Sequence, residues 1–121
     1  MTNKPQTITI DEVKYVRADS VAQAIEMDGE YSIIRCDRSG VFAGVITKEE
    51  GNSATVVNVR RLWYWSGAAS LSQLALEGTK KPDDCKFTAP NPEIRLKDVI
   101  EVLPCSKKAK ESILGVKVWS V

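Results

Sequence analysis

Apolar and polar residues alternate along the middle of the chain, and this pattern predicts three consecutive β-strands. The first covers Tyr31–Cys36, the second Val41–Thr47, and the third and longest Ala54–Trp65. Asp37–Gly40 and Lys48–Ser53 are polar, contain glycine, and separate the strands as turns. Strands joined by such short turns form an antiparallel meander.

Two features of these strands bear on a site. Gly44 lies inside the second strand and indicates a bulge, or a close approach by another backbone or a ligand. Strict alternation along the third strand puts one arginine on each face. One face carries Val57, Val59, Arg61, Trp63 and Trp65, and the other carries Val56, Asn58, Arg60, Leu62 and Tyr64. Both faces are partly apolar, so the sequence leaves open which of them is buried.

The second half of the chain predicts helices and further strands. Ser66–Glu77 is the clearest helix, because Ser70 and Gln73 have the spacing of a capping box. Residues 94–103 supply one or two more strands that end at Pro104. Ser106 caps a short helix that reaches Leu114, and an edge strand over residues 116–119 closes the chain.

Together these elements predict an α+β fold. We expect a small curved antiparallel sheet of about five strands, packed by one main helix and one short C-terminal helix. Thr7–Arg17 predicts a hairpin and Val21–Met27 a short helix, so residues 1–29 form an N-terminal arm and residues 30–121 the main domain. The arm and the last edge strand offer surfaces that can pair with another copy, and we expect a homo-oligomer.

Composition narrows the class of protein. The 121 residues carry a net charge of +1, with 43% hydrophobic and 27% charged residues, as in an ordinary globular domain. No apolar run approaches the ~20 residues of a membrane span, and no signal peptide is visible. We therefore expect a cytoplasmic protein without a membrane partner. The nearly neutral charge argues against binding of duplex nucleic acid.

The titratable residues argue against an enzyme. The chain has no histidine, which removes the commonest general base and every Ser–His or Cys–His pair. Its three cysteines form no C-x-x-C pair, so we expect no metal site and no cofactor. Catalysis by a carboxylate, a lysine or a tyrosine stays open, although no motif pairs such groups.

The candidate ligand site is the end of the third strand. Aromatic rings stack on bases, and guanidinium groups pair with phosphate. The expected ligand-binding residues are Arg60, Arg61, Trp63, Tyr64 and Trp65, followed by Ser66, Gly67 and Ser70 at the helix start, with Arg35 and Phe87 as weaker candidates. The small residues would let a ligand approach free helix N–H groups. The same pattern fits buried tryptophans beside solvated or ion-paired arginines, and both interpretations stay open.

From Tyr31 to Trp119 the sequence resembles a family of small, largely uncharacterised proteins of tailed bacteriophages. The resemblance rests on SGVFAG at 39–44, RRLWYWSGAASLSQL at 60–74, CKF at 85–87 and IEVLPC at 100–105. The arm, IDEVKYVRADS at 10–20, resembles a hairpin at the start of other small phage proteins. Some members carry a transporter-ATPase label, but this chain lacks a G-x-x-x-x-G-K-[ST] loop.

The phage resemblance implies a function by binding, because small accessory phage proteins without catalytic residues often act in that way. By analogy with phage sponges, we expect an anti-defence protein in the bacterial cytoplasm that sequesters a nucleotide second messenger without cleaving it. The ligand would be a cyclic ADP-ribose isomer or a cyclic oligonucleotide. One alternative is an accessory factor that binds and inhibits a host or defence protein. A second is a metal-independent enzyme that degrades the signal.

Overall fold

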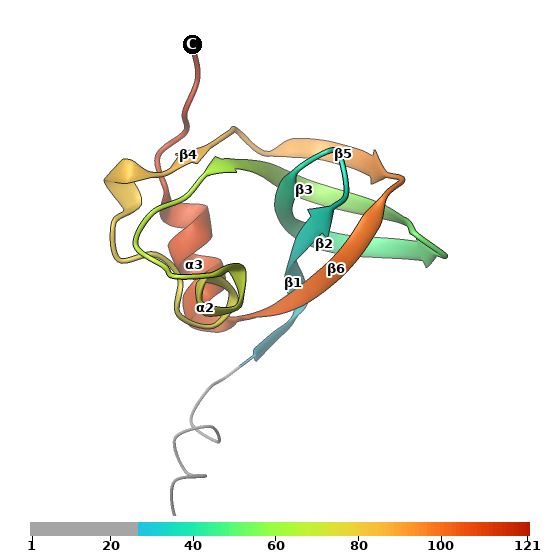
Figure 1. Cartoon of the computed structure of the whole chain (residues 1–121), viewed down its shortest axis with the longest axis horizontal. Helices are drawn as coiled ribbons and strands as arrows, with labels where there is room; N and C mark the ends of the chain where they lie inside the picture. Colours follow the sequence, from blue (N-terminus) through green and yellow to red (C-terminus); the bar gives the residue numbers. More distant parts are fainter. Residues whose placement is uncertain (1–26) are drawn as a thin grey trace, which may run out of the picture.

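A curled antiparallel sheet packs against two helices in the computed structural model, which describes residues 27–121 (Figure 1). The strands are β1 Met27–Cys36, β2 Val41–Glu50, β3 Ser53–Tyr64, β4 Lys86–Phe87, β5 Asn91–Leu96 and β6 Val99–Ser106; the helices are α2 Leu71–Glu77 and α3 Lys107–Gly115, with a 3-10 turn at Pro82–Asp84. The expected α+β class is confirmed. The expected hairpin of the N-terminal arm lies outside the described residues.

The order of the strands explains the curl of the sheet. The path is β4-β3-β2-β1-β6, and β5 pairs with the first half of β3. Strands β5 and β6 therefore belong to opposite ends of the sheet, yet only two residues, Lys97 and Asp98, connect them. So short a connection brings the two ends together, and the sheet bends into a half-barrel (Figure 1).

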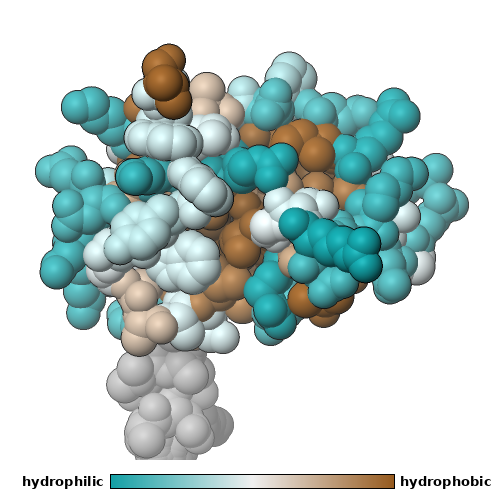
Figure 2. Space-filling view, turned by 45° about the horizontal axis from the view of Figure 1, so that its top comes forward, coloured by the Kyte–Doolittle hydropathy of each residue, from teal (hydrophilic) through white to brown (hydrophobic). Residues whose placement is uncertain are grey.

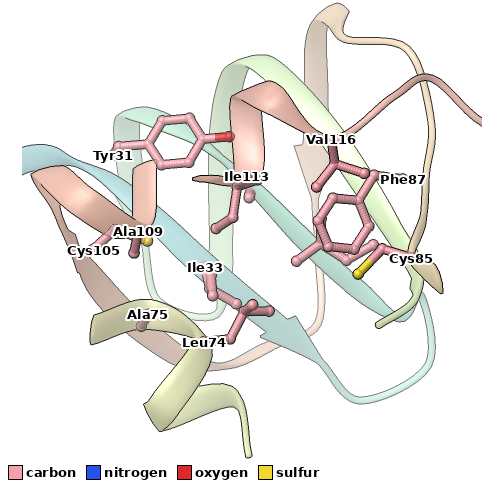
Figure 3. Packing of buried hydrophobic residues seen from close by; sticks show 12 residues of the cluster. Tyr31, Ile33, Leu74, Ala75, Cys85, Phe87, Cys105, Ala109, Ile113 and Val116 are labelled. Carbon is pink, nitrogen blue, oxygen red and sulfur yellow. The ribbon is translucent and has the colours of Figure 1, made fainter. Parts of the chain in front are cut away.

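Both faces of the curled sheet are buried. Inside the curl lies a cluster contributed by strands alone: Ile34, Cys36, Phe42, Ala54, Val56, Val59 and Leu96. The other face packs against the helices, with Ile33, Leu62 and Phe87 meeting Leu74 of α2 and Ile113 of α3 (Figure 3). Neighbouring residues of β1, such as Ile33 and Ile34, therefore enter different clusters.

A bulge in β3 changes which side chains share a face. Ala43 pairs with Arg60 and Val45 with Val57, so a three-residue step on β3 opposes a two-residue step on β2. Asn58 supplies the extra residue, with a φ of 53°. As a result Val56 and Val59 both point into the curl. The predicted faces are therefore wrong across Asn58, because strict alternation assumes an unbroken ladder.

Several element boundaries also differ from the prediction. Strand β1 begins at Met27, where a helix was expected to end. Pro104 lies inside β6 rather than after it, which the edge position of β6 permits because one side of that strand needs no ladder hydrogen bonds. The expected last strand is a single parallel bridge between Val118 and Phe87. Helix α2 begins at Leu71, five residues later than predicted.

Across residues 27–121, no helix has the length and apolar character needed to span a membrane.

Asp98, in the β5–β6 connection, holds the turn between β1 and β2. Its carboxylate accepts hydrogen bonds from the Arg38 N–H at 2.6 Å, and from the Ser39 N–H and hydroxyl at 3.2 and 2.8 Å. These bonds, the one from the Arg38 N–H above all, lower the pKa of Asp98. The contact fixes the turn whose Ser39 carbonyl accepts from Arg61.

The bulge leads to a prediction about Gly44, which lies opposite it. A Cβ at Gly44 would come within 2.8 Å of the Val56 side chain, 2.9 Å of the Val57 carbonyl oxygen and 3.0 Å of the Val59 Cα. Because two of these atoms are backbone, we expect Gly44→Ala to lower the free energy of unfolding by about 1–3 kcal/mol. Gly115→Ala is the control, since nothing lies within 4 Å of the added methyl group. Equal urea midpoints for the two variants would contradict this account of the bulge.

Candidate functional site

Arg60, expected as a phosphate ligand, is buried. Only 1% of its surface is exposed. Its guanidinium donates from Nε to the Thr88 carbonyl at 2.7 Å, from Nη1 to the Ile113 carbonyl at 2.6 Å, and from Nη2 to the Phe87 carbonyl at 3.0 Å. Burial lowers the pKa of Arg60, which nevertheless stays charged at neutral pH. Contrary to the expected role in phosphate binding, Arg60 contacts the protein's own backbone and is not available to a ligand.

The Ile113 carbonyl explains why a charged group is tolerated there. It lies in the last turn of α3, at the negative end of the helix dipole, where it also accepts from the Val116 N–H at 3.3 Å. A guanidinium is a favourable partner for that end. The Phe87 ring lies below the same guanidinium, 5.6 Å from centroid to Cζ, and is fully buried. Phe87, which was also expected to bind the ligand, is therefore not accessible to one.

The other two arginines of the expected site lie apart from each other. Arg61 is exposed, stacks over the Phe42 ring at 4.5 Å and donates from Nη1 to the Ser39 carbonyl at 2.6 Å. Arg35 forms an ion pair with Glu101 at 2.9 Å, across the β1–β6 ladder. Arg61 thus keeps an accessible guanidinium near the end of β3, whereas Arg35 belongs to another strand pair.

The expected anion cradle at the start of α2 is filled by the protein. The Gly67 carbonyl accepts from the Lys80 N–H at 3.1 Å, and a Cβ at Gly67 would meet the Lys81 nitrogen at 2.5 Å. Ser70 caps α2 by accepting from the Gln73 N–H at 3.2 Å, and the Gln73 side chain accepts from the Ala69 N–H at 2.8 Å. The small residues therefore allow close packing of the chain on itself, and the backbone groups around them already have partners within the protein.

Exposed aromatic side chains gather where β3 ends. Trp63 and Tyr64 are 61% and 53% exposed, and the Trp63 ring lies 6.4 Å from the Trp119 ring, with 33° between the planes. Tyr64 pairs across the ladder with Lys86, whose Nζ lies 5.6 Å from the Trp119 ring. We call Trp63, Tyr64, Lys86 and Trp119 the aromatic surface. Figure 2 turns this side forward and shows pale side chains of intermediate hydropathy gathered below the C-terminal end.

Two hollows flank Trp119 on this side of the molecule. The larger, about 440 Å³, is lined by Tyr64, Ser66, Asp83, Asp84, Cys85, Lys86 and Trp119. The smaller, about 370 Å³, is lined by Pro82, Asp83, Cys85, Lys117, Val118 and Trp119. Both volumes fall within the range of roughly 300–1,000 Å³ that small-molecule sites occupy. Both hollows are open to solvent, and Cys85 forms part of both floors.

The segment that carries Trp119 is held in place next to Arg60. The Phe87 carbonyl accepts from Arg60 and also from the Trp119 N–H at 2.9 Å. Trp65, by contrast, is half-buried and packs against the core on the helix side. Ser66 borders the larger hollow, while its carbonyl accepts from the Thr79 hydroxyl at 2.5 Å.

The structure therefore gathers only part of the expected site. It places Tyr64 and Ser66 in the lining of the larger hollow and Trp63 against the Trp119 ring that borders it, with Arg61 two residues before Trp63 on β3. The same hollow is also lined by Lys86, Trp119 and the Asp83–Asp84 pair, which the sequence patterns did not mark as candidate site residues. The one sequence signal for Trp119 was its place in the predicted edge strand over residues 116–119. Within residues 27–121, no group of three Cys, Asp or Glu side chains is placed to hold a metal ion.

A family model described as a domain of unknown function, DUF6948, matches residues 29–113. The match covers most of the chain, and the chain belongs to this family. It includes Trp63, Tyr64 and Lys86 and ends before Trp119. No curated protein and no solved structure shows a significant match. The resemblance to phage proteins thus stays a prediction.

The neighbouring arginines make a matched pair for a test of stability. We expect Arg60→Ala to lower the free energy of unfolding by at least about 3 kcal/mol, because it removes the charged donor that three carbonyl groups share and opens a cavity. Arg61→Ala removes an exposed side chain, and we expect a loss of about 1 kcal/mol or less. Urea unfolding of the two variants measures both values. Similar losses would contradict the structural role of Arg60.

Proposed function

We propose that this DUF6948 member binds a nucleotide second messenger of bacterial immunity and sequesters it without cleavage, as a phage anti-defence protein. The ligand class is a cyclic ADP-ribose isomer or a cyclic oligonucleotide. The observation that carries the proposal is the aromatic surface: Trp63, Tyr64 and Trp119 are brought together from β3 and the C-terminal segment beside a hollow of about 440 Å³. Globular domains bury most of their large rings, so several accessible ones in one place favour recognition.

Base stacking is the interaction that this surface supplies. The Trp63 and Trp119 rings are tilted rather than parallel. Trp63 is exposed, whereas Trp119 is half-buried and Lys86 lies over its ring. A base that stacks on one aromatic ring gains about 1–3 kcal/mol. Stacking alone does not distinguish a nucleotide from another flat molecule, so the charges around the rings matter as well.

Cations next to the rings support a phosphate-bearing ligand. Lys86 lies over Trp119, and Lys117 borders the smaller hollow. Arg61 lies two residues before Trp63 on β3, and its guanidinium lies over Phe42 and donates to the Ser39 carbonyl. None of these three cations forms an ion pair within the described part of the chain. The two lysines thus take the phosphate role that the sequence suggested for Arg60 and Arg61.

The side chains that could act as bases or nucleophiles favour binding over cleavage. The whole chain lacks histidine. Burial, reinforced by the nearby Asp98 carboxylate, raises the pKa of the Cys36 thiol to about 11, so this cysteine is protonated at neutral pH and is a poor nucleophile. Cys85 lies in the floor of the hollow, where its sulfur is within 3.6 Å of the Ser66 carbonyl, the Thr79 hydroxyl and the Lys81 carbonyl.

A protein partner is the second candidate function, and the openness of the surface favours it. Trp63, Tyr64 and Val118 project far enough to act as anchors in a partner's pockets, and large aromatic residues dominate such interfaces. In this case the protein would be an accessory factor that inhibits a host or defence protein. The two functions use the same residues and differ in whether a purified small molecule binds.

A thermal-shift panel of cyclic ADP-ribose isomers and cyclic di- and trinucleotides tests the proposal. A ligand at about 100 times its dissociation constant stabilises a fold by ~2.7 kcal/mol. For a domain of this size we expect a rise of several degrees in the midpoint. The ligand is then released by heat and identified by mass spectrometry. Intact ligand supports sequestration, whereas a new product supports the degrading enzyme.

Variants connect any shift to the aromatic surface. We expect Trp63→Ala and Trp119→Ala to weaken binding of the active compound by about 5- to 150-fold, since each removes one stacking partner. Ile100→Ala is the matched control, because Ile100 is as exposed as Tyr64 but lies on β6, at the other edge of the sheet. A panel without any shift, or unchanged binding in both tryptophan variants, would contradict the proposal.

A further inference from the structure

We infer that the larger hollow selects guanine over adenine, through the carboxylates of Asp83 and Asp84. This inference rests on the proposed function and makes the ligand class more specific. It starts from the lining of that hollow, where two acidic side chains lie beside the Tyr64 and Trp119 rings. A site for phosphate alone would not place two negative charges there, so another part of the ligand must face them.

The backbone fixes the position of the turn that carries the two aspartates. They lie on the 3-10 turn Pro82–Asp84, which is closed by hydrogen bonds from the Asp84 N–H to the Lys81 carbonyl and from the Cys85 N–H to the Pro82 carbonyl. The Thr79 hydroxyl donates to the Ser66 carbonyl and accepts from the Lys81 N–H at 2.9 Å. The turn is thereby tied to the end of β3, which carries the aromatic residues.

Both carboxylates are available to a ligand. Asp83 and Asp84 are exposed, and across residues 27–121 neither forms an ion pair or a side-chain hydrogen bond. An ionised carboxylate only accepts hydrogen bonds, so it needs donors from the ligand. Lys86 and Lys117 lie beside the same Trp119 ring. A nucleotide would therefore direct its phosphate towards the lysines and the donor edge of its base towards the aspartates.

Guanine matches this arrangement better than adenine does. The Watson–Crick edge of guanine has two adjacent donors, N1–H and the N2 amino group, which can pair with both oxygens of one carboxylate. The amino group of adenine lies between two ring nitrogens that are acceptors, and these repel a carboxylate. Hydrogen bonds to a charged acceptor are stronger than neutral ones, and an unmatched donor or acceptor at the contact is costly. Within the proposed ligand class, the hollow thus favours cyclic oligonucleotides that contain guanine over ADP-ribose derivatives.

Calorimetric titration of the full chain with cyclic diguanylate and cyclic diadenylate tests the preference. We expect the guanine compound to bind at least about tenfold more tightly, the equivalent of one charge-assisted hydrogen bond. GMP, IMP and AMP then separate the two donors, because IMP keeps N1–H and lacks the N2 amino group. The expected order of affinity is GMP, then IMP, then AMP.

The double variant Asp83→Asn/Asp84→Asn tests the role of the carboxylates. It keeps the shape of both side chains and removes their charge, so we expect the ratio of guanine to adenine affinity to fall towards one while adenine binding is unchanged or stronger. Asp37→Asn is the control, since Asp37 is an exposed aspartate on the β1–β2 turn, and it should keep the parent ratio.

The outcomes separate the two proposals. Equal affinities for the guanine and adenine compounds, or a preference that survives the double variant, would overturn the guanine inference and leave nucleotide binding intact. If no nucleotide binds, nucleotide binding itself is overturned, and the guanine inference falls with it. Guanine preference that the double variant abolishes supports both proposals.

Discussion

The contact between the Arg60 guanidinium and three backbone carbonyls determines the arrangement of the second half of the fold. It joins β3 to the end of β4 through Phe87 and Thr88, and to the last turn of α3 through Ile113. The Phe87 carbonyl also accepts from the Trp119 N–H, so the segment that carries Trp119 depends on the same contact. One buried cation thus fixes the core on the helix side and places a principal ring of the aromatic surface.

The bulge at Asn58 decides which of the two adjacent arginines takes that internal role. It adds one residue to β3, after which Arg60 and Leu62 face the helices while Arg61 lies over Phe42 on the other side. Gly44 makes the bulge possible because its missing side chain leaves room for the Val57 carbonyl. An internal arginine and an accessible arginine therefore follow from one local irregularity, and the accessible one lies two residues before Trp63.

Sequence patterns were sufficient for the fold class, the three-strand meander, the bulge near Gly44 and the caps at Ser70 and Ser106. These features depend on local chemistry. The burial of Arg60 was not predictable, because its partners are backbone carbonyls of residues 27 to 53 positions away, and a carbonyl has no signature in a sequence. Similarly, the segment with Trp119 reaches the aromatic surface through a single bridge between Val118 and Phe87, which alternation cannot reveal. The sequence singled out the end of β3 as a candidate site, which stays a prediction, and the division between core and surface residues required the tertiary contacts.

The most direct test of this account is the hydrogen exchange of the arginine Nε–H groups, measured by NMR on the labelled protein. Because the Arg60 Nε–H is buried and bonded to the Thr88 carbonyl, we expect it to exchange only through large-scale opening, with protection close to that of the core amides of β1 and β3. Arg38 has an exposed side chain and should exchange as in a peptide. If the Arg60 Nε–H exchanged as fast as that of Arg38, the guanidinium would be accessible, and its central place in the fold would be contradicted.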